Sequence, residues 1–171
     1  MAALVHIAAG FASRPLSRKV PVWFLIIAAE TLDILALLFW LLGVEKTGYF
    51  PWSHGLLMSA ASSLAFGALS AAIFKSYRAG ILAGLIVFSH WVIDFITHPM
   101  GAVFGGKPAQ PDLPLLLGGS PMVGLGLYNH SIVVAYAVEY GSMAIGIGVY
   151  VLFLIRQRSR RRADGAVAPA E

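Results

Sequence analysis

Cysteine is absent from the 171-residue chain, and charged residues are scarce. The lack of cysteine excludes disulfide bonds, thiolate catalysis and the cysteine-ligated types of zinc and iron–sulfur site. Charged residues make up only 12% of the chain, whereas 58% are hydrophobic; soluble domains usually carry about 25% charged residues. Such a chain cannot cover itself with a water-soluble surface. The composition therefore indicates an integral membrane protein, and it excludes a disordered chain and a basic nucleic-acid-binding domain.

Two common hydrolase motifs are also missing. The chain contains no Gly-x-Ser-x-Gly nucleophile motif and no His-Glu-x-x-His motif. Because these motifs build the active sites of most serine hydrolases and of the zincin metalloproteases, neither class is expected.

Long apolar stretches predict an all-α integral membrane protein with four transmembrane helices. A helical span needs about 20 apolar residues. Four stretches meet this requirement, and they cover Val20–Val44, Leu56–Phe74, Ala79–Thr97 and Ser131–Ile155. A fifth apolar stretch, Met1–Ser13, is too short to span and has no preceding positive charge, so we expect a retained half-helix. Residues 1–155 then form one transmembrane domain, and residues 156–171 are expected to form a basic, disordered tail.

The basic residues lie mainly on one side of this arrangement. Ten of the twelve lysines and arginines fall before the first span, between the second and third, or after the fourth: Arg14, Arg18, Lys19, Lys75, Arg78, Arg156, Arg158, Arg160, Arg161 and Arg162. Since positive residues concentrate on the cytoplasmic side of membrane proteins, this side is predicted to be cytoplasmic. Both longer loops would then face outward.

Small residues recur at four-residue spacing in two of the spans. Ser59, Ser63, Gly67 and Ala71 follow one another in the second span, and Gly80 and Gly84 lie in the third. Small residues at this spacing let two helices approach closely, so we expect packing here and no chemistry.

Half of the eight acidic residues lie inside predicted spans, namely Glu30, Asp33, Asp94 and Glu139. A charge at the centre of a bilayer costs from about 3 to more than 10 kcal/mol. No lysine or arginine lies inside a span to pair with these acids. Their partners must therefore be histidines, hydroxyl groups, protons or a metal ion.

Three polar residues share one face of the third span. His90, Asp94 and His98 follow one another at intervals of four residues, which places them on one side of a helix. Neighbouring members can reach a common ion, but His90 and His98 are about 12 Å apart along a straight helix. His98 must therefore lie in a bend before Pro99 or serve a second role.

The polar residues also share one depth. At about 1.5 Å per residue, Asp94 lies about 24 Å from Arg78 and Glu139 about 25 Å from Arg156. Asp33 lies about 20 Å from Val20 by the same rise, and His54 and His130 lie at the outer ends of their spans. Polar residues of every span thus converge in the outer half of the membrane, which predicts a functional site. His130 alone also suits a structural role, since Asn129 and Ser131 beside it are typical of a helix cap.

Three segments together resemble a known group of proteins. They are Ala29-Glu30-Thr31-Leu32-Asp33, Trp52-Ser53-His54-Gly55 and Ser89-His90-Trp91-Val92-Ile93-Asp94-Phe95-Ile96-Thr97-His98. Their order and spacing are similar to the bacterial inner-membrane metal-dependent hydrolases of the YdjM-like group, over roughly the first hundred residues. The resemblance implies that His6, Glu30, Asp33, His54, His90 and Asp94 are metal ligands or acid–base residues.

The chain departs from the pattern of that group at two places. Gly55 follows His54 directly, so the arginine of the group's His-Arg-Gly segment is missing, and its later Thr-His-Ser histidine is replaced in Leu56-Leu57-Met58-Ser59. The acidic pair reads Glu30-Thr31-Leu32-Asp33 instead of Pro-Asp-x-Asp.

Two hypotheses about function follow. In the first, the chain is a membrane-embedded metal-dependent hydrolase with metal ligands His6, Asp33, His90 and Asp94. Glu30 or Glu139 would be the general base and His54 would orient the substrate. Histidine and carboxylate ligands suit zinc, and also manganese or iron. A site in the outer half of the bilayer predicts a lipid or lipid-linked substrate, such as a phosphate ester.

In the second hypothesis, the chain is a proton- or metal-coupled carrier, since chains of intramembrane acids and histidines serve as proton relays. A carrier of four spans is expected to work as a homodimer, although no inverted repeat is visible. A haem bound between His54 and His130 is a weaker third interpretation, because nothing else marks a haem site. Roles for His98, Asp112 and His130 are not assigned from the sequence.

Overall fold

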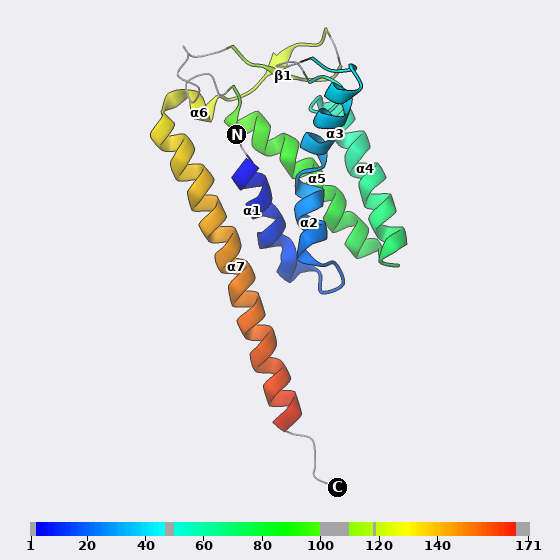
Figure 1. Ribbon diagram of the computed structural model, residues 1–171, viewed down its shortest axis with the longest axis vertical. Helices are drawn as coiled ribbons and strands as arrows, with labels where there is room; N and C mark the ends of the chain where they lie inside the picture. The colour runs from blue at the N-terminus through cyan, green and yellow to red at the C-terminus, as the bar shows by residue number, and fades with distance from the viewer. Residues whose placement is uncertain (1–2, 47–49, 100–109, 118, 167–171) are drawn as a thin grey trace.

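A computed structural model describes residues 3–46, 50–99, 110–117 and 119–166 of the chain (Figure 1). Its helices are α1 (Ala3–Ser13), the short 3-10 helix η1 (Arg14–Leu16), α2 (Val22–Ala29), α3 (Thr31–Leu41), α4 (Leu56–Ile73), α5 (Tyr77–Thr97), α6 (Leu127–His130) and α7 (Ile132–Ala166). Two short strands, β1 (Leu113–Pro114) and β2 (Met122–Val123), pair antiparallel.

The prediction of a helical membrane protein is confirmed at this level. Three helices, α4, α5 and most of α7, are long and apolar enough to cross a membrane, and the bent pair α2 and α3 makes a fourth if it counts as one span. The predicted half-helix is present as α1. In Figure 1, the α1–α2 turn, the α4–α5 turn and the C-terminal end of α7 lie at the same end of the bundle. The predicted basic segments therefore do share one end.

The first predicted span is not one continuous helix. α2 and α3 meet at an angle of 55°, and Glu30 lies at the break between them. The imidazole Nδ1 of His90 lies 2.6 Å from the carbonyl oxygen of Ala29, one residue before the break. A side chain that bonds to a helix carbonyl is a known cause of a kink. The bend thus arises where α5 contacts the first span.

The prediction of a disordered tail from residue 156 is wrong for the described residues, because α7 continues as a helix to Ala166. This last part of α7 extends beyond the rest of the bundle (Figure 1). Its five arginines are exposed: Arg156, Arg158, Arg160, Arg161 and Arg162. Arginine is a good helix former, and no proline interrupts the helix before its end.

The predicted small residues hold α4 against α5. A Cβ atom on Gly80 would lie only 2.6 Å from the carbonyl oxygen of Gly67 and 2.7 Å from Cβ of Ala71. The hydroxyl group of Ser63 donates a hydrogen bond of 2.6 Å to the carbonyl oxygen of Gly84. Helix backbones can approach this closely only when the facing residues are small, so the packing prediction is confirmed.

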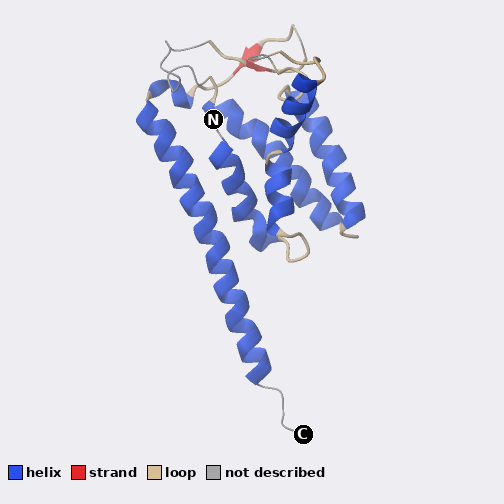
Figure 2. Cartoon of the chain, viewed as in Figure 1, coloured by secondary structure: helices blue, strands red, loops and turns tan. Residues whose placement is uncertain are grey.

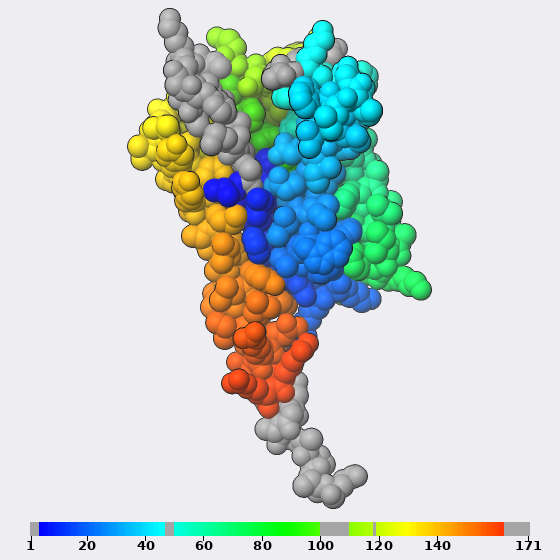
Figure 3. Space-filling model, viewed as in Figure 1, coloured from blue at the N-terminus to red at the C-terminus, as the bar shows by residue number. Residues whose placement is uncertain are grey.

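α1 is enclosed by two other helices in the same way. A Cβ atom on Gly146 of α7 would lie 2.6 Å from the carbonyl oxygen of Ala8, and one on Gly10 would lie 2.9 Å from Cα of Ile26 in α2. In Figure 3 the dark blue atoms of α1 show as a narrow strip between α7 and α2. The half-helix is therefore fixed inside the bundle.

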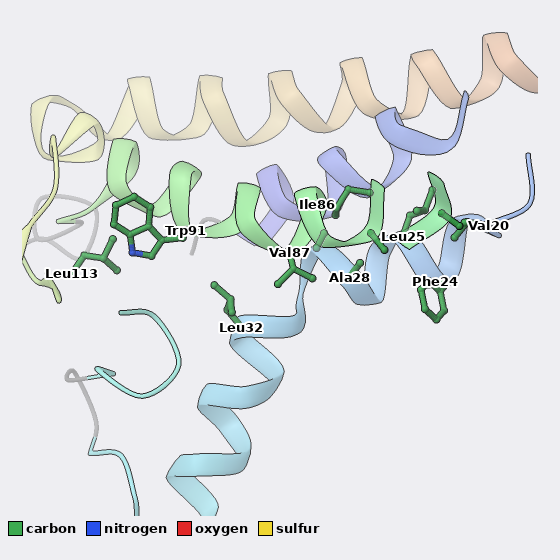
Figure 4. Packing of buried hydrophobic residues seen from close by; sticks show 12 residues of the cluster. Val20, Phe24, Leu25, Ala28, Leu32, Ile86, Val87, Trp91 and Leu113 are labelled. Atoms are coloured by element: carbon green, nitrogen blue, oxygen red, sulfur yellow. The ribbon is translucent and has the colours of Figure 1, made fainter. Parts of the chain in front are cut away.

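The apolar core lies between α2 and α5 (Figure 4). Leu25 and Ala28 of α2 pack with Val87 of α5, and all three are fully buried. Leu113 of β1 joins the same cluster near the outer end of α5. The described part of the predicted outer loop crosses this end of the bundle as strands, turns and α6, as Figure 2 shows. The core holds α5 in place, and α5 carries His90 and Asp94.

Candidate metal centre

Four histidines direct a ring nitrogen toward one buried carboxylate, that of Asp94 in α5. The Nε2 atom of His6 lies 3.3 Å from Oδ1 of Asp94, and that of His98 lies 3.8 Å from the same oxygen. The Nε2 atoms of His90 and His54 lie 3.4 Å and 3.5 Å from Oδ2. Asp94 is only 2% exposed. Residues from α1, from the turn before α4, and from α5 with its C-cap thus meet at one point.

Three of these imidazoles are oriented through their other nitrogen. The Nδ1 atom of His90 lies 2.6 Å from the carbonyl oxygen of Ala29. That of His98 lies 3.2 Å from Oδ1 of Asp112. Metal-binding histidines usually donate this second ring N–H to a carbonyl or carboxylate group, which fixes the ring and leaves Nε2 free to bind the ion. The arrangement has this pattern.

His54 is oriented by a longer chain of contacts. Its Nδ1 lies 2.8 Å from the hydroxyl oxygen of Ser53. The hydroxyl group donates its single proton to the carboxylate of Glu45, 2.9 Å away, so it accepts from His54. The buried Glu45 also accepts from the backbone N–H groups of Trp52 and Ser53, at 2.7 Å and 2.8 Å. Glu45 therefore fixes the turn that carries His54.

The geometry favours a cation between these groups over direct hydrogen bonds. A neutral histidine that donates through Nδ1 presents a lone pair at Nε2, which repels a carboxylate oxygen unless a positive charge lies between them. Charge-assisted N–H···O bonds are about 2.7–2.9 Å long, whereas the separations around Asp94 are 3.3–3.8 Å. Ligands about 2.0–2.1 Å from a tetrahedral zinc ion lie about 3.3 Å apart, which matches the shorter of these distances.

One set of four ligands is complete. Oδ1 of Asp33 lies 3.3 Å from Nε2 of His54 and 3.8 Å from Nε2 of His90. Both histidines also face Oδ2 of Asp94, at 3.5 Å and 3.4 Å. Each of the two histidines thus contacts both carboxylates, and the ligand atoms of Asp33, His54 and His90 all lie within 4.8 Å of one another. Asp33, His54, His90 and Asp94 could hold a divalent ion, and the side chain of Asp33, 49% exposed, leaves one edge open.

The structure brings together most of the residues that the sequence singles out. His6, Asp33, His90 and Asp94, predicted as ligands, lie within this cluster. His54, predicted to orient substrate, lies between the two aspartates and is placed as a ligand. The other predicted or unassigned residues are Glu30, Glu139, His98, Asp112 and His130.

Glu30 lies at the bend between α2 and α3, three residues before Asp33. It is partly buried, and its Oε1 atom is buried without a hydrogen-bond partner in the described part of the chain. His98 is the C-cap residue of α5. It therefore lies in the bend before Pro99, which is one of the two possibilities predicted from its spacing. His130, at the end of α6, is exposed, and Ser131 caps α7 by accepting from the N–H group of Val133.

Glu139, which its depth predicts to lie with the other polar residues of the site, makes its contacts elsewhere. One of its carboxylate oxygens accepts from the backbone N–H group of Leu4 at 3.1 Å, and the other accepts from the hydroxyl group of Tyr128 at 2.9 Å. Burial, together with this bond, raises the pKa of Tyr128 above its usual value, so the phenol keeps its proton. Glu139 thereby anchors the first turn of α1, two residues before His6, and it belongs to neither ligand set found among the described residues.

No role is predicted from the sequence for three residues of this site, Glu45, Ser53 and Asp112. Each lies in a loop, where no periodicity shows which way a side chain points. A Ser-His dipeptide after an acidic loop residue is too common to serve as a signal.

Comparison with models of protein families, with curated proteins and with solved structures gave no match to this chain. The resemblance to the YdjM-like group therefore stays a prediction that rests on the three sequence segments.

Removing the hydroxyl group of Ser53 tests how His54 is held. We expect Ser53→Ala to weaken zinc binding by about 10- to 100-fold, as is typical when a residue that orients a ligand is lost, because Nδ1 of His54 and the carboxylate of Glu45 both lose a partner. Zinc affinity of the detergent-purified protein, measured by competition with a chromogenic chelator, gives the result. Ser142→Ala is the control, since Ser142 bonds only to backbone carbonyls of its own helix. Equal zinc affinity in Ser53→Ala and the parent would show that this contact does not orient a ligand.

Proposed function

We propose that the chain is a metal-dependent hydrolase of the bacterial inner membrane, with a divalent ion held by Asp33, His54, His90 and Asp94. The observation that supports the proposal is the set of four separations of 3.3–3.8 Å between two histidines and two aspartates in the membrane-spanning bundle. Two nitrogen and two oxygen ligands suit zinc best, and manganese or iron next. The cysteine-free composition agrees with such a ligand set.

A bound divalent ion would act as a Lewis acid and lower the pKa of a coordinated water molecule. The residues of the chain would hold the ligands in position and provide a general base. His54 and His90 are locked through Nδ1, so their Nε2 atoms keep their direction. Glu30 is the candidate general base, because its Oε1 atom is buried and free of hydrogen bonds to other described residues. Carboxylates within reach of the reacting water commonly take this role.

The open edge of the site favours a lipid substrate. Asp33 is the exposed ligand, and the next turns of α3 form an apolar groove with the loop before α4. The groove has a volume of about 310 Å³ and is lined by Ala36, Leu37, Trp40 and Phe50. The ring centroid of Phe50 lies 5.9 Å from that of His54. A substrate with an aliphatic chain in the groove would therefore present its polar end to Asp33 and His54.

The basic end of the bundle supports an orientation. The α1–α2 turn, the α4–α5 turn and the end of α7 carry ten of the twelve basic residues and lie together (Figure 1). Positive residues on the cytoplasmic side would place the metal centre in the outer half of the membrane. The substrate would then reach the site from the outer leaflet.

Metal content is the first test of this function. We expect the purified parent protein to retain a stoichiometric transition metal and Asp94→Asn to retain none, because the neutral amide cannot replace the negative charge of the carboxylate ligand. Asp94→Asn should still insert and fold, since burial of a neutral amide costs less than burial of a carboxylate. Elemental analysis gives the metal content, and a thermal melt checks the fold.

His130→Asn is the control for this experiment, because His130 is exposed and lies outside the ligand sets. A metal-free parent that takes up protons in vesicles would instead favour the carrier. Equal metal content in the parent and Asp94→Asn would remove Asp94 from the site.

Because the chain has no cysteine, single cysteines can test the orientation. Gln110 and Ser159 are both exposed. Gln110 lies three residues before β1, and Ser159 lies in the C-terminal part of α7, at the opposite end of the bundle from β1 (Figure 1). In spheroplasts, a membrane-impermeant maleimide should label Gln110→Cys at once and Ser159→Cys only after the membrane is opened. Labelling of both from outside, or of Ser159→Cys alone, would contradict the proposed orientation.

Truncation of the groove tests the substrate class. With a long-chain phosphatidic acid in detergent micelles and saturating zinc, we expect Trp40→Ala to raise KM about tenfold at unchanged kcat, because it removes apolar contacts of the chain worth about 1.4 kcal/mol. Phosphate release measures the rate, and Leu64→Ala, in an apolar groove between α4 and α5, is the control. Equal activity of the parent on para-nitrophenyl phosphate and on the lipid would refute a lipid-selective site.

A further inference from the structure

We propose that the centre holds two divalent ions and that the carboxylate of Asp94 bridges them. The proposal rests on the function proposed above, in which the first ion is bound by Asp33, His54, His90 and Oδ2 of Asp94. The second ion would be bound by His6, His98 and Oδ1 of Asp94. Nothing in the first ligand set requires these last two histidines.

The histidines divide between the two oxygens of one carboxylate. His54 and His90 approach Oδ2, at 3.5 Å and 3.4 Å. His6 and His98 approach Oδ1, at 3.3 Å and 3.8 Å. A zinc ion usually takes four ligands, and the first ion has four without Oδ1. The remaining oxygen, with Nε2 of His6 and of His98, is then left for a second ion. Of these two histidines, His6 belongs with Asp94 and His90 to a group whose ligand atoms all lie within 4.8 Å of one another, and His98 contacts Oδ1 from the C-cap of α5.

His6 is the residue that most needs a second cation. It is only 2% exposed, and neither of its ring nitrogens has a hydrogen-bond partner among the described residues. Buried polar atoms without partners are rare in folded proteins, because the lost hydration is not replaced. The ring centroids of His6 and His90 lie 3.6 Å apart. Two positively charged imidazoles at this separation would repel each other, whereas an ion between Nε2 of His6 and Oδ1 of Asp94 would give that nitrogen a partner without charging both rings.

The fold fixes His6 beside Asp94 from three sides. Glu139 binds the N–H group of Leu4 in the first turn of α1. Gly146 allows α7 to lie against α1 at Ala8, and Gly10 allows α2 to lie against its last turn. These contacts hold the half-helix so that its one histidine lies against Asp94. Glu139 is thus a positioning residue for the second site.

His98 has the orientation of a ligand and leaves access to solvent. Its Nδ1 lies 3.2 Å from the carboxylate of Asp112, while its Nε2 faces Asp94. The side chains of His98 and Asp112 are 23% and 44% exposed. A carboxylate that holds the outer nitrogen of a ligating histidine is a recurrent feature of zinc sites. The second ion would keep open positions toward this exposed side, whereas Asp33 is the exposed ligand of the first.

Two ions joined by one carboxylate define the class of substrate more narrowly. Many centres of this type act on phosphate esters, where one ion stabilises the attacking oxygen and the other the leaving oxygen. The balanced reaction adds water across the P–O bond: the phosphoryl group gains a hydroxyl oxygen, and the alcohol leaves with a proton. A lipid phosphate ester in the groove beside Asp33 would meet these requirements.

Metal stoichiometry and magnetic coupling test the second site. The full chain, purified in detergent and stripped of metal, is loaded with Mn²⁺. We expect two Mn²⁺ per parent chain, with the electron paramagnetic resonance signal of a coupled pair. His98→Asn and His6→Asn should each bind one Mn²⁺ and show an uncoupled signal. His130→Asn is the matched control and should bind two.

The outcomes separate this proposal from the proposed function. One uncoupled Mn²⁺ in the parent, unchanged in His98→Asn, would overturn the second site and leave the single-ion hydrolase standing. No bound Mn²⁺ in the parent would overturn both. Because His6 is buried, His6→Asn is checked by a thermal melt; if it does not fold, the parent and His98→Asn, which changes a partly exposed residue, still decide the result.

Discussion

A carboxylate inside an apolar bundle is stable only if positive charge compensates it, and Asp94 is the residue on which this requirement falls. The chain provides no lysine or arginine at that depth. Four imidazoles surround the carboxylate instead, and the distances between them and Asp94 leave room for a cation. The positions of α1, of the bend in the first span and of the turn before α4 all serve to bring these histidines to Asp94.

The scaffold meets this requirement with contacts that carry no chemistry. Glycine and serine residues bring α4 against α5, and glycines hold α1 between α2 and α7. The bond from His90 to the carbonyl oxygen of Ala29 links the ligand to the bend that directs Asp33. One residue thus both binds in the site and shapes the helix that supplies its neighbour. A loss of close helix packing would therefore displace the residues of the candidate metal centre.

Much of the site can be predicted from the sequence, because helical spacing and depth are properties of the chain itself. His90 and Asp94 are one turn apart, and Asp33 falls at a similar depth on another span. Depth does not give the direction in which a side chain points around its helix, however. Glu139 shares the layer but binds Leu4 and Tyr128, and the loop residue Glu45 offers no periodic signal at all.

The differences between the predicted and the observed fold have similar causes. The bend at Glu30 depends on a contact with His90, 60 residues further along the chain, and local patterns do not contain that contact. The continuation of α7 to Ala166 was open to prediction, since the arginine-rich segment has good helix formers and no proline; charge alone is a poor guide to disorder.

An anomalous diffraction measurement at the zinc absorption edge, on crystals of zinc-loaded protein, tests directly whether an ion lies between these histidines and aspartates. We expect an anomalous peak about 2.0–2.1 Å from Nε2 of His54 and of His90, with Asp33 and Oδ2 of Asp94 completing the shell. A map without a peak, in which the imidazoles close onto Asp94 at hydrogen-bonding distances of about 2.7–2.9 Å, would contradict it and leave a proton network in place of a metal centre.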